Sequence, residues 1–294
     1  MMEPFKKYSI NLRGRLVTIE RPWVMGIINV TPDSFYCGSR VNDERTLIER
    51  VHAMIADGAD VIDVGACSTR PGSESIDAKG EMERLKWAIA AIRRETPDAI
   101  LSVDTYRADV VRRCVAEWGA DIINDISGGT LDELMFSTIA ELKVPYVMMH
   151  MRGTPETMSS ITDYDDVTAD VVGWLARRID ELRQLGVSGI IADPGFGFAK
   201  TLEQNYEMLA RLDAFHALEV PLLVGVSRKR MIYTPLGCNA DEALNGTTVV
   251  NTIALLHGSH ILRVHDVKAA VEAVKLTTIY RENAPVDEKY NYQQ

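Results

Sequence analysis

The chain has 294 residues and a formal net charge of −10, and 46% of its residues are hydrophobic while 25% are charged. This composition is typical of a globular protein with a large core, and the negative charge argues against a nucleic-acid partner. The N-terminal segment lacks the apolar stretch of a secretory signal and the apolar runs are too short for a membrane span. We therefore expect a cytosolic protein whose four cysteines are reduced thiols.

The first predicted element is a short β-hairpin over residues 8–19. The segment YSINLRGRLVTI alternates in character around Arg13-Gly14, as hairpins do at a tight turn. We expect this hairpin to cover the bottom of a larger unit. The predicted organisation is a single domain, with the hairpin in about residues 1–21, the main body in 22–282 and a tail in 283–294.

Eight short apolar segments then follow along the chain, and each has a polar residue or a glycine at or near its end. They are VMGIINV (24–30), DVIDVG (60–65), AILSVD (99–104), ADIIND (120–125), VPYVMMH (144–150), GIIADPG (189–195), PLLVGVS (221–227) and HILRVHD (260–266). Each is too short for a helix and almost continuously apolar. That pattern is typical of strands that are buried on both faces of a parallel sheet.

Amphipathic stretches alternate with these strands. Helical spacing of apolar residues predicts helices over 43–57, 81–95, 108–118, 131–142, 165–185, 203–218, 241–257 and 266–282. The first of them has Asn42 and Asp43 as candidate N-caps and Gly58 as its stop.

The alternation of eight strands with eight helices predicts a TIM (β/α)8 barrel with a short N-terminal β-hairpin. The length alone would also allow two domains. A doubly wound sheet usually has fewer strands and a Gly-rich first turn, and the pattern G-x-G-x-x-G is absent after the first strand.

Active sites of TIM barrels lie at the carboxyl ends of the strands, and polar residues gather there in this sequence. The candidates are Asn29, Asp104, Asn124, Asp193, Lys229, Arg263 and His265. Asp63, Asp125 and Asp266 also lie at strand ends, and for these we favour structural or capping roles. Within the first group, five residues would meet in one pocket if the barrel prediction is correct: Asp104, Asn124, Asp193, Lys229 and Arg263.

The chemistry of this group suits a flat heterocycle and an anion. A carboxylate such as that of Asp193 can accept two parallel N–H bonds from a 2-amino-pyrimidinone edge. Lys229, Arg263 and His265, with Arg70 from a loop, suit a phosphate. A hydrolase of neutral sugars needs little beyond two carboxylates, and a zinc hydrolase needs more histidines at the strand ends.

Two loops rich in Pro, Gly and Ser follow the first two strands, at 31–40 and 67–74. Loops of this composition are exposed and mobile. We interpret them as a lid over a second substrate. The alternative, ordinary surface turns, stays open.

The sequence resembles the pterin-binding family, and within it the dihydropteroate synthases, over about residues 22–275. The matching segments are GIINVTPDSF (26–35), DVIDVGACSTRPGSE (60–74), SVDTYR (102–107), GADIINDISGG (119–129), MMHMRGTPETM (148–158), DPGFGFAKT (193–201), GVSRK (225–229) and RVHDV (263–267). The resemblance implies a transferase of folate biosynthesis. Such an enzyme joins 6-hydroxymethyl-7,8-dihydropterin pyrophosphate to 4-aminobenzoate and releases pyrophosphate in the presence of Mg²⁺. Similar enzymes are sulfonamide targets.

The resemblance also implies residue roles. It implies pterin contacts by Asp104, Asn124, Met148, Asp193, Phe198 and Lys229. It implies pyrophosphate contacts by Asn29, Arg70, Arg263 and His265, with Asn29 on the magnesium side. It implies an aminobenzoate site formed by Phe35, Ser68, Thr69, Arg70, Pro71, Lys229 and Arg230. Asp104, Lys229, Arg263 and His265 are the expected catalytic residues.

The expected reaction is a dissociative, SN1-like substitution. Pyrophosphate leaves once cations neutralise it, and a nearby carboxylate such as that of Asp104 stabilises the positive charge on the pterin. The aromatic amine carries its own lone pair and needs no strong base.

The sequence departs from the family pattern at several points. The departures at Cys67 and Arg230 lie in the part of the sequence that is expected to bind aminobenzoate. Cys67 stands where Glu is frequent, after Ala66 in place of Gly. Residues 36–39 replace Ser-Asp-Gly-Gly, Arg152 replaces Gln, and Arg230 replaces a frequent Ser.

Three other functions remain open on the sequence alone. They are a pterin-binding methyltransferase with a corrinoid partner, a catalytically silent pterin-binding protein, and a barrel hydrolase unrelated to pterins. The two loop motifs argue against the first, and the near-complete set of strand-end residues argues against the second. The lack of metal-ligating histidines argues against the third. The resemblance further implies a homodimer formed by late helices, where Val249, Ile253 and Leu256 form an apolar stripe. The same stripe would equally fit core packing.

Overall fold

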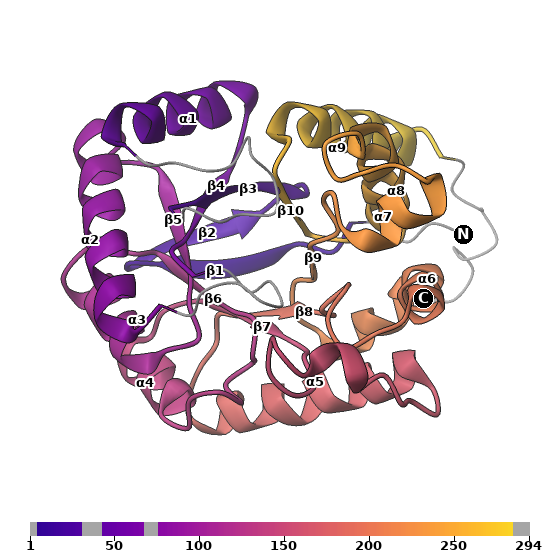
Figure 1. Cartoon of the computed structure of the whole chain (residues 1–294), viewed down its shortest axis with the longest axis horizontal. Helices are drawn as coiled ribbons and strands as arrows, with labels where there is room; N and C mark the ends of the chain where they lie inside the picture. The colour runs from indigo at the N-terminus through magenta and orange to yellow at the C-terminus, as the bar shows by residue number, and fades with distance from the viewer. Residues whose placement is uncertain (1–4, 31–42, 68–75, 285–294) are drawn as a thin grey trace, which may run out of the picture.

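The computed structural model describes residues 5–30, 43–67 and 76–284. Its main body is an eight-stranded parallel sheet that curls into a barrel, with helices packed around it (Figure 1). The strands are β3 (Trp23–Asn29), β4 (Val61–Gly65), β5 (Ile100–Asp104), β6 (Ile122–Asp125), β7 (Tyr146–Met149), β8 (Ile190–Asp193), β9 (Leu223–Val224) and β10 (Ile261–Val264). The TIM-barrel prediction is confirmed.

The order of the strands shows how the barrel closes. The hydrogen-bonded order is β8-β7-β6-β5-β4-β3-β10-β9. A parallel bridge between Ala192 and Leu222 then joins β8 to the start of β9, supported by a 2.9 Å hydrogen bond from the Ala192 N–H to the Pro221 carbonyl. Because all the strands are parallel, their carboxyl ends meet at one end of the barrel.

The strands were predicted to be buried on both faces, and the structure shows how each face is used. In β8, Ile190 and Ala192 pack toward the helices, whereas Ile191 packs inside the barrel. The same alternation places Asp193 inside, one position beyond Ala192. Strand alternation therefore decides which strand-end residue enters the lumen.

The N-terminal hairpin consists of β1 (Tyr8–Leu12) and β2 (Arg15–Ile19), which pair antiparallel. Ile10, Leu12 and Ile19 are buried in one cluster with residues from the first halves of the barrel strands. Arg13, at the turn, also pairs with Asp121 at 2.6 Å between Nε and Oδ1. The hairpin thus covers the N-terminal end of the barrel.

The helices follow the predicted alternation. They are α1 (Glu44–Asp57), α2 (Ala78–Glu95), α3 (Ala108–Ala116), α4 (Met135–Leu142), α5 (Val167–Gln184), α6 (Leu202–Ala210), α7 (Arg230–Leu236), α8 (Leu244–Leu256) and α9 (Val267–Glu282). Asp43 caps α1 by accepting from the Thr46 N–H at 2.9 Å, and Gly58 ends that helix in the left-handed conformation. Both of these signals had been identified in the sequence.

Two helical predictions were incomplete. The stretch predicted as one helix over 203–218 is divided into α6 and a 3-10 helix, η3 (Leu212–Leu218), with the break at Arg211. The short helix α7 between β9 and α8 was not predicted. It contains Pro235 and spans only two turns, so it lacks the long apolar period that identified the other helices. A second 3-10 helix, η2 (Met158–Ser160), follows β7.

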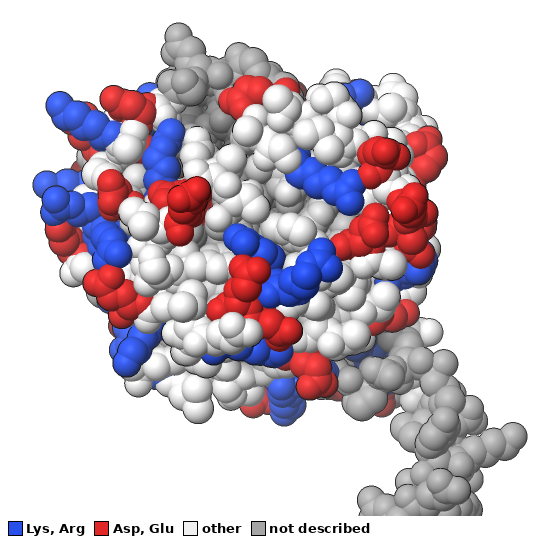
Figure 2. Space-filling model, turned by 90° about the horizontal axis from the view of Figure 1, so that it is seen from below, with Lys and Arg blue, Asp and Glu red and all other residues white. Residues whose placement is uncertain are grey.

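The outer surface carries both signs of charge. Figure 2 shows Lys and Arg side chains close to Asp and Glu side chains over one face of the molecule. Exposed ion pairs of the molecule include Arg211 with Asp166 and Arg112 with Glu141. Within the described ranges, no helix is long and apolar enough to cross a membrane.

Candidate active site

The barrel brings four strand-end positions into one row. In the strand register, Asn29 pairs with Gly65, Gly65 with Asp104, and Asp104 with Asn124. A Cβ atom at Gly65 would lie 3.4 Å from both Asn29 Oδ1 and Asp104 Cβ. The glycine therefore leaves space between two candidate residues that lie 75 positions apart in the chain.

Arg263 lies at the centre of the charges in this row. Its Nε atom donates to Asp63 Oδ2 at 2.7 Å, and its Nη2 atom donates to Asp104 Oδ2 at 2.6 Å. Asn124 Nδ2 also donates to Asp63 Oδ2, at 3.2 Å. Asp63 is fully buried, as predicted for a structural residue, and it fixes the orientation of both partners.

The carboxyl group of Asp104 is held at the boundary between its two protonation states. Its pKa is raised to about 7: burial raises it most, the Arg263 guanidinium lowers it, and the neighbouring Asp63 carboxylate raises it. The Arg263 guanidinium thus forms ion pairs with two carboxylates, Asp63 and Asp104, where little solvent is accessible. Asp104 is therefore sensitive to any further charge that enters the pocket.

The other half of the site comes from the end of β8 and the loop that follows it. Asp193 is buried and accepts a hydrogen bond from the Gly195 N–H at 2.7 Å. Burial raises its pKa, while Lys229 and that hydrogen bond lower it. Lys229 Nζ lies 4.6 Å from the centroid of the Phe198 ring and donates to the Phe196 carbonyl at 2.6 Å. A carboxylate, an ammonium group and an aromatic face thus meet at this edge.

His265 is buried beside Arg263, and this environment decides its charge. Burial lowers its pKa to about 3, with a further lowering by Arg263, so the imidazole is neutral near pH 7. Its Nδ1 atom lies 3.1 Å from Ser227 Oγ. His265 can therefore offer an N–H bond to an anion, but it adds no positive charge. Arg230, by contrast, is exposed at the first position of α7.

Met148 is not placed in the pocket, which corrects the sequence-based assignment. It packs in the core between the sheet and the helices, and Tyr146 of the same strand packs there too. Its neighbour Met149 instead belongs to the cluster against which Phe198 packs. Adjacent strand residues point to opposite faces, and the apolar run around 148 gave no signal of which faced inward.

Two buried cations close to the site were not identified from the sequence. Arg228 forms a two-pronged ion pair with Asp266, at 2.8 and 2.9 Å, and donates to the carbonyls of Ala240 and Asp241. It adopts a φ of +55°, immediately before Lys229. Lys200 is buried in the loop after β8. A lysine inside the apolar, Gly-rich segment DPGFGFAK was the available signal for the second.

The expected aminobenzoate residues Phe35, Ser68, Thr69, Arg70 and Pro71 lie outside the described residues, as does the proposed lid. The residues that flank 68–75 are held by Arg107. Its Nη2 atom donates to the Ile76 carbonyl at 2.8 Å, its Nη1 atom lies 3.5 Å from Cys67 Sγ, and it pairs with the buried Glu81.

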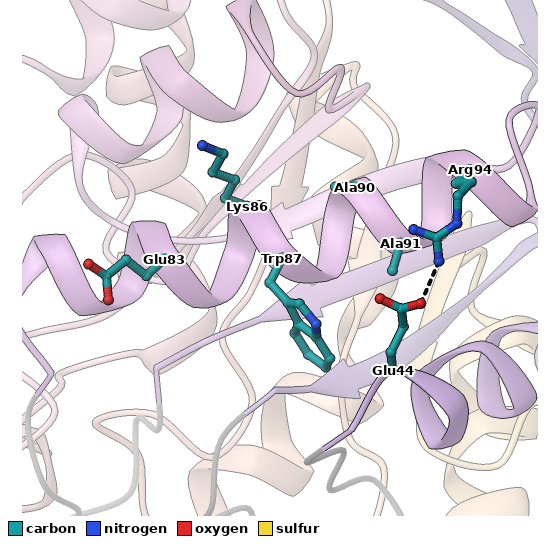
Figure 3. Close-up of a pocket in the computed structure, with 7 residues that line it drawn as sticks. All are labelled: Glu44, Glu83, Lys86, Trp87, Ala90, Ala91 and Arg94. Carbon is teal, nitrogen blue, oxygen red and sulfur yellow. Dashed lines mark hydrogen bonds and ion pairs between the residues drawn. The ribbon is translucent and has the colours of Figure 1, made fainter.

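A separate groove of about 360 Å³ lies on the outside of α2, next to the start of α1 (Figure 3). Its lining residues are Glu44, Glu83, Lys86, Trp87, Ala90, Ala91 and Arg94. An ion pair of 2.5 Å between Arg94 and Glu44 crosses it. These residues belong to helices and not to strand ends, so this groove is distinct from the barrel pocket.

The site offers few ligands to a metal ion. Among the described residues, no group of three His, Cys, Asp or Glu side chains could hold one. Mg²⁺ is commonly bound by one or two protein oxygens together with waters and substrate phosphates. The carboxamide oxygen of Asn29, which lies beside Gly65 and Asp104, fits that kind of site.

Comparison with known proteins gives a consistent result. The family model described as "Pterin binding enzyme" matches residues 25–265. A dihydropteroate synthase of Synechocystis sp. is 42% identical over 260 residues, which cover 87% of this chain and 89% of the relative.

Solved structures agree with the sequence comparison. A Yersinia pestis dihydropteroate synthase in a sulfonamide complex superposes with a TM-score of 0.88 at 36% identity, covering 94% of this chain and 99% of the other. A Burkholderia cenocepacia dihydropteroate synthase complexed with 7,8-dihydropteroate superposes with a TM-score of 0.83 at 35% identity, covering 94% and 97%.

Proposed function

The chain belongs to the pterin-binding enzyme family, and on that premise we propose that it is a dihydropteroate synthase of folate biosynthesis. It would condense 6-hydroxymethyl-7,8-dihydropterin pyrophosphate with 4-aminobenzoate to give 7,8-dihydropteroate and pyrophosphate. The observation that carries the proposal is the meeting of Asp104, Asn124, Asp193 and Lys229 at the carboxyl end of the barrel. The similarity to synthases over most of the chain disfavours the methyltransferase alternative.

The pterin is proposed to bind between the two halves of the site. Asp193 is buried and already accepts one backbone N–H, so it can accept the amino-pyrimidinone edge through its remaining lone pairs. Asn124 would complete the recognition of the ring, and Phe198 with Lys229 would cover it. A planar heterocycle rich in N–H donors matches these acceptors.

The leaving pyrophosphate is proposed to lie near Asn29, Arg263 and His265. Arg263 uses Nε and Nη2 on the two carboxylates, so the phosphate contact would fall to Nη1. The neutral imidazole of His265 would donate one hydrogen bond. Mg²⁺, held on the Asn29 side, would neutralise charge on the leaving group.

We propose a dissociative order of bond changes. The C–O bond to pyrophosphate breaks first, and its electron pair leaves with the phosphate. The positive charge spreads into the pterin ring and is stabilised by the ionised Asp104 carboxylate. The aminobenzoate nitrogen then forms the C–N bond with its lone pair and releases a proton to solvent. Pyrophosphate release in the absence of 4-aminobenzoate tests this order, and complete dependence on the amine would contradict it.

The aminobenzoate site is proposed to involve Lys229 and Arg230, with the expected loop residues Phe35, Ser68, Thr69, Arg70 and Pro71. Arg230 is exposed at the start of α7, and it would meet the carboxylate of aminobenzoate at the outer edge of the pocket. Sulfonamides, as mimics of 4-aminobenzoate, are expected to compete at this position.

A homodimer is proposed through α8 and α9. Large apolar side chains on these helices are exposed: Leu244, Val249, Leu276, Ile279 and Tyr280. A groove of about 580 Å³ runs between the two helices beside Leu244 and Leu276. Of the stripe expected from the sequence, Val249 is exposed, whereas Ile253 packs partly against the core. Exposed apolar patches of this kind mark interaction surfaces.

The assignment is tested by turnover with both substrates and Mg²⁺. We expect an active wild-type enzyme and a loss of at least about 100-fold in kcat/KM for Asp193→Ala, because a charge-assisted contact to the pterin is removed. The matched control is Asp98→Ala, a change of the same kind at an exposed loop carboxylate. An inactive wild type would refute the function, and an active Asp193→Ala would refute the pterin anchor.

A further inference from the structure

The loop that follows β8 is held by two lysine side chains. Lys229 Nζ donates to the Phe196 carbonyl at 2.6 Å. Lys200 Nζ donates to the carbonyls of Gly195 and Phe198, at 3.0 and 2.9 Å. Three of the four carbonyls from 195 to 198 are therefore bound by ammonium groups. This loop carries Phe198, and its Gly195 N–H donates a hydrogen bond to Asp193.

The backbone of this loop needs such support. Gly195, Gly197 and Ala199 have φ values of +70°, +79° and +49°. The last of these is uncommon for a residue with a side chain. A Cβ atom at Gly195 would lie 2.1 Å from the His150 carbonyl oxygen, so the loop also packs tightly over the end of β7. The contacts of Lys200 stabilise this compact conformation.

Lys200 makes a third contact, in which its Nζ atom donates to His150. Its Nζ atom lies 3.1 Å from His150 Nδ1. Burial lowers the pKa of His150 to about 2, so the ring is neutral and Nδ1 can accept. The ring is held edge-on to Trp174 of α5, with centroids 5.1 Å apart. An ammonium group has three N–H donors, and here each one faces an acceptor.

The charges around Lys200 come from several elements. Asp193 at the end of β8 stabilises its ammonium form, whereas Lys229 and Arg152 from the neighbouring loops oppose it. Burial lowers its pKa to about 7. In return, the Lys200 charge favours the ionised form of Asp193. The lysine thus acts on Asp193 both through the loop and through its charge.

We infer that Lys200 is a positioning residue for the pterin half of the site. It binds the loop that carries Phe198 and donates the Gly195 N–H to Asp193, with His150 as its neutral partner, and it does not contact the second substrate. This inference rests on the proposed function. It predicts a selective effect on the pterin substrate, which a general loss of stability would not give.

The test is a comparison of steady-state constants for both substrates. Lys200→Met removes the three donors and keeps an unbranched apolar chain of similar length. We expect the KM for the pterin pyrophosphate to rise by about tenfold or more, while the KM for 4-aminobenzoate changes less than about twofold. Lys86→Met is the matched control on the exposed face of α2, and neither KM should change (Figure 3).

A milder variant covers the case in which Lys200→Met fails to fold. His150→Phe removes one acceptor and keeps a ring beside Trp174, so the pterin KM should rise by about threefold. Direct titration of folded variants with the pterin alone should show the same order of affinities. Equal rises in both KM values, or an unchanged pterin KM in both variants, would overturn the inference. An inactive wild type would instead refute the proposed function.

Discussion

At the scale of single residues, the carboxyl group of Asp104 faces opposing influences on its charge. Burial and Asp63 favour the neutral acid, and Arg263 favours the carboxylate. Three side chains from three strands produce this balance. A developing positive charge on a bound pterin would shift it toward the carboxylate, which is the form that stabilises such a charge.

This balance predicts how the activity depends on pH. The pKa of Asp104 is raised to about 7, so the carboxylate is present above pH 7 and is lost as the pH falls below it. We expect kcat to fall by about tenfold per pH unit below 7. Asp104→Asn should lack this part of the pH profile and be slower at pH 8 by about 100-fold.

The titration of the substrate must be separated from that of Asp104 in this pH profile. Its terminal phosphate also titrates near pH 6, by analogy with phosphate esters. The pH dependence that remains in Asp104→Asn measures the substrate together with the other groups that titrate in this range, such as Lys200. The difference between the two profiles measures Asp104. Identical profiles for the two enzymes would contradict a role for its ionisation.

At the scale of elements, the loops after β8 and β9 depend on buried contacts more than on local sequence preference. Arg228 has a positive φ and is held by Asp266 and by two carbonyls near the start of α8. The loop after β8 is held by Lys200. Each loop places one candidate pterin residue, Lys229 or Phe198, at the edge of the pocket.

Substitution of Gly195, in the loop after β8, and of Gly186, in the turn before β8, separates the effect of backbone strain from that of steric overlap. Gly195 and Gly186 both have positive φ, but only a Cβ at Gly195 would overlap the His150 carbonyl. Gly186→Ala should lower the free energy of unfolding by about 1–2 kcal/mol through backbone strain alone. Gly195→Ala should cost clearly more and should also weaken pterin binding. Urea denaturation and pterin titration measure the two effects, and equal costs would contradict this account.

At the scale of the whole molecule, the hairpin covers one end of the barrel and the candidate site occupies the other. Ile19 is fully buried with the residues that line the N-terminal end, whereas Leu16 on the same strand is 72% exposed. The two ends should therefore be separable by mutation: one governs stability and the other governs activity.

Truncation in the hairpin tests this separation. Ile19→Ala should lower the free energy of unfolding by about 2–5 kcal/mol, because a buried side chain is removed from the core. The KM values of the folded protein should not change. Leu16→Ala, the exposed control, should leave both properties as they are. A change of KM in Ile19→Ala would show that the hairpin also shapes the site.

Assembly is tested by placing a charge on the apolar face of α9. Leu276 is 69% exposed and lies beside the groove between α8 and α9. Leu276→Lys should weaken the dimer by about 100-fold or more, because a charge would be buried at the interface. Light scattering measures the result, with Leu134→Lys as the control at an exposed leucine before α4. A monomeric wild type would refute the proposed dimer.

The sequence by itself determined the barrel, because short apolar runs that alternate with amphipathic stretches allow few other folds. It also identified the set of polar strand ends, since parallel strands bring those ends together. It did not identify which of Met148 and Met149 faces inward, because both faces of these strands are apolar. Nor did it predict α7, whose two turns carry too little periodicity to detect.

Only the tertiary structure decided the charges and the supports of the site. The neutral state of His265, the pKa of Asp104 and the pairing of Arg263 with Asp63 depend on burial and on neighbours that are distant in the chain. The role inferred for Lys200 depends on His150, 50 residues away. Electrostatic interactions follow distances in space, which a linear sequence does not contain, and so these properties appear only once the chain is folded.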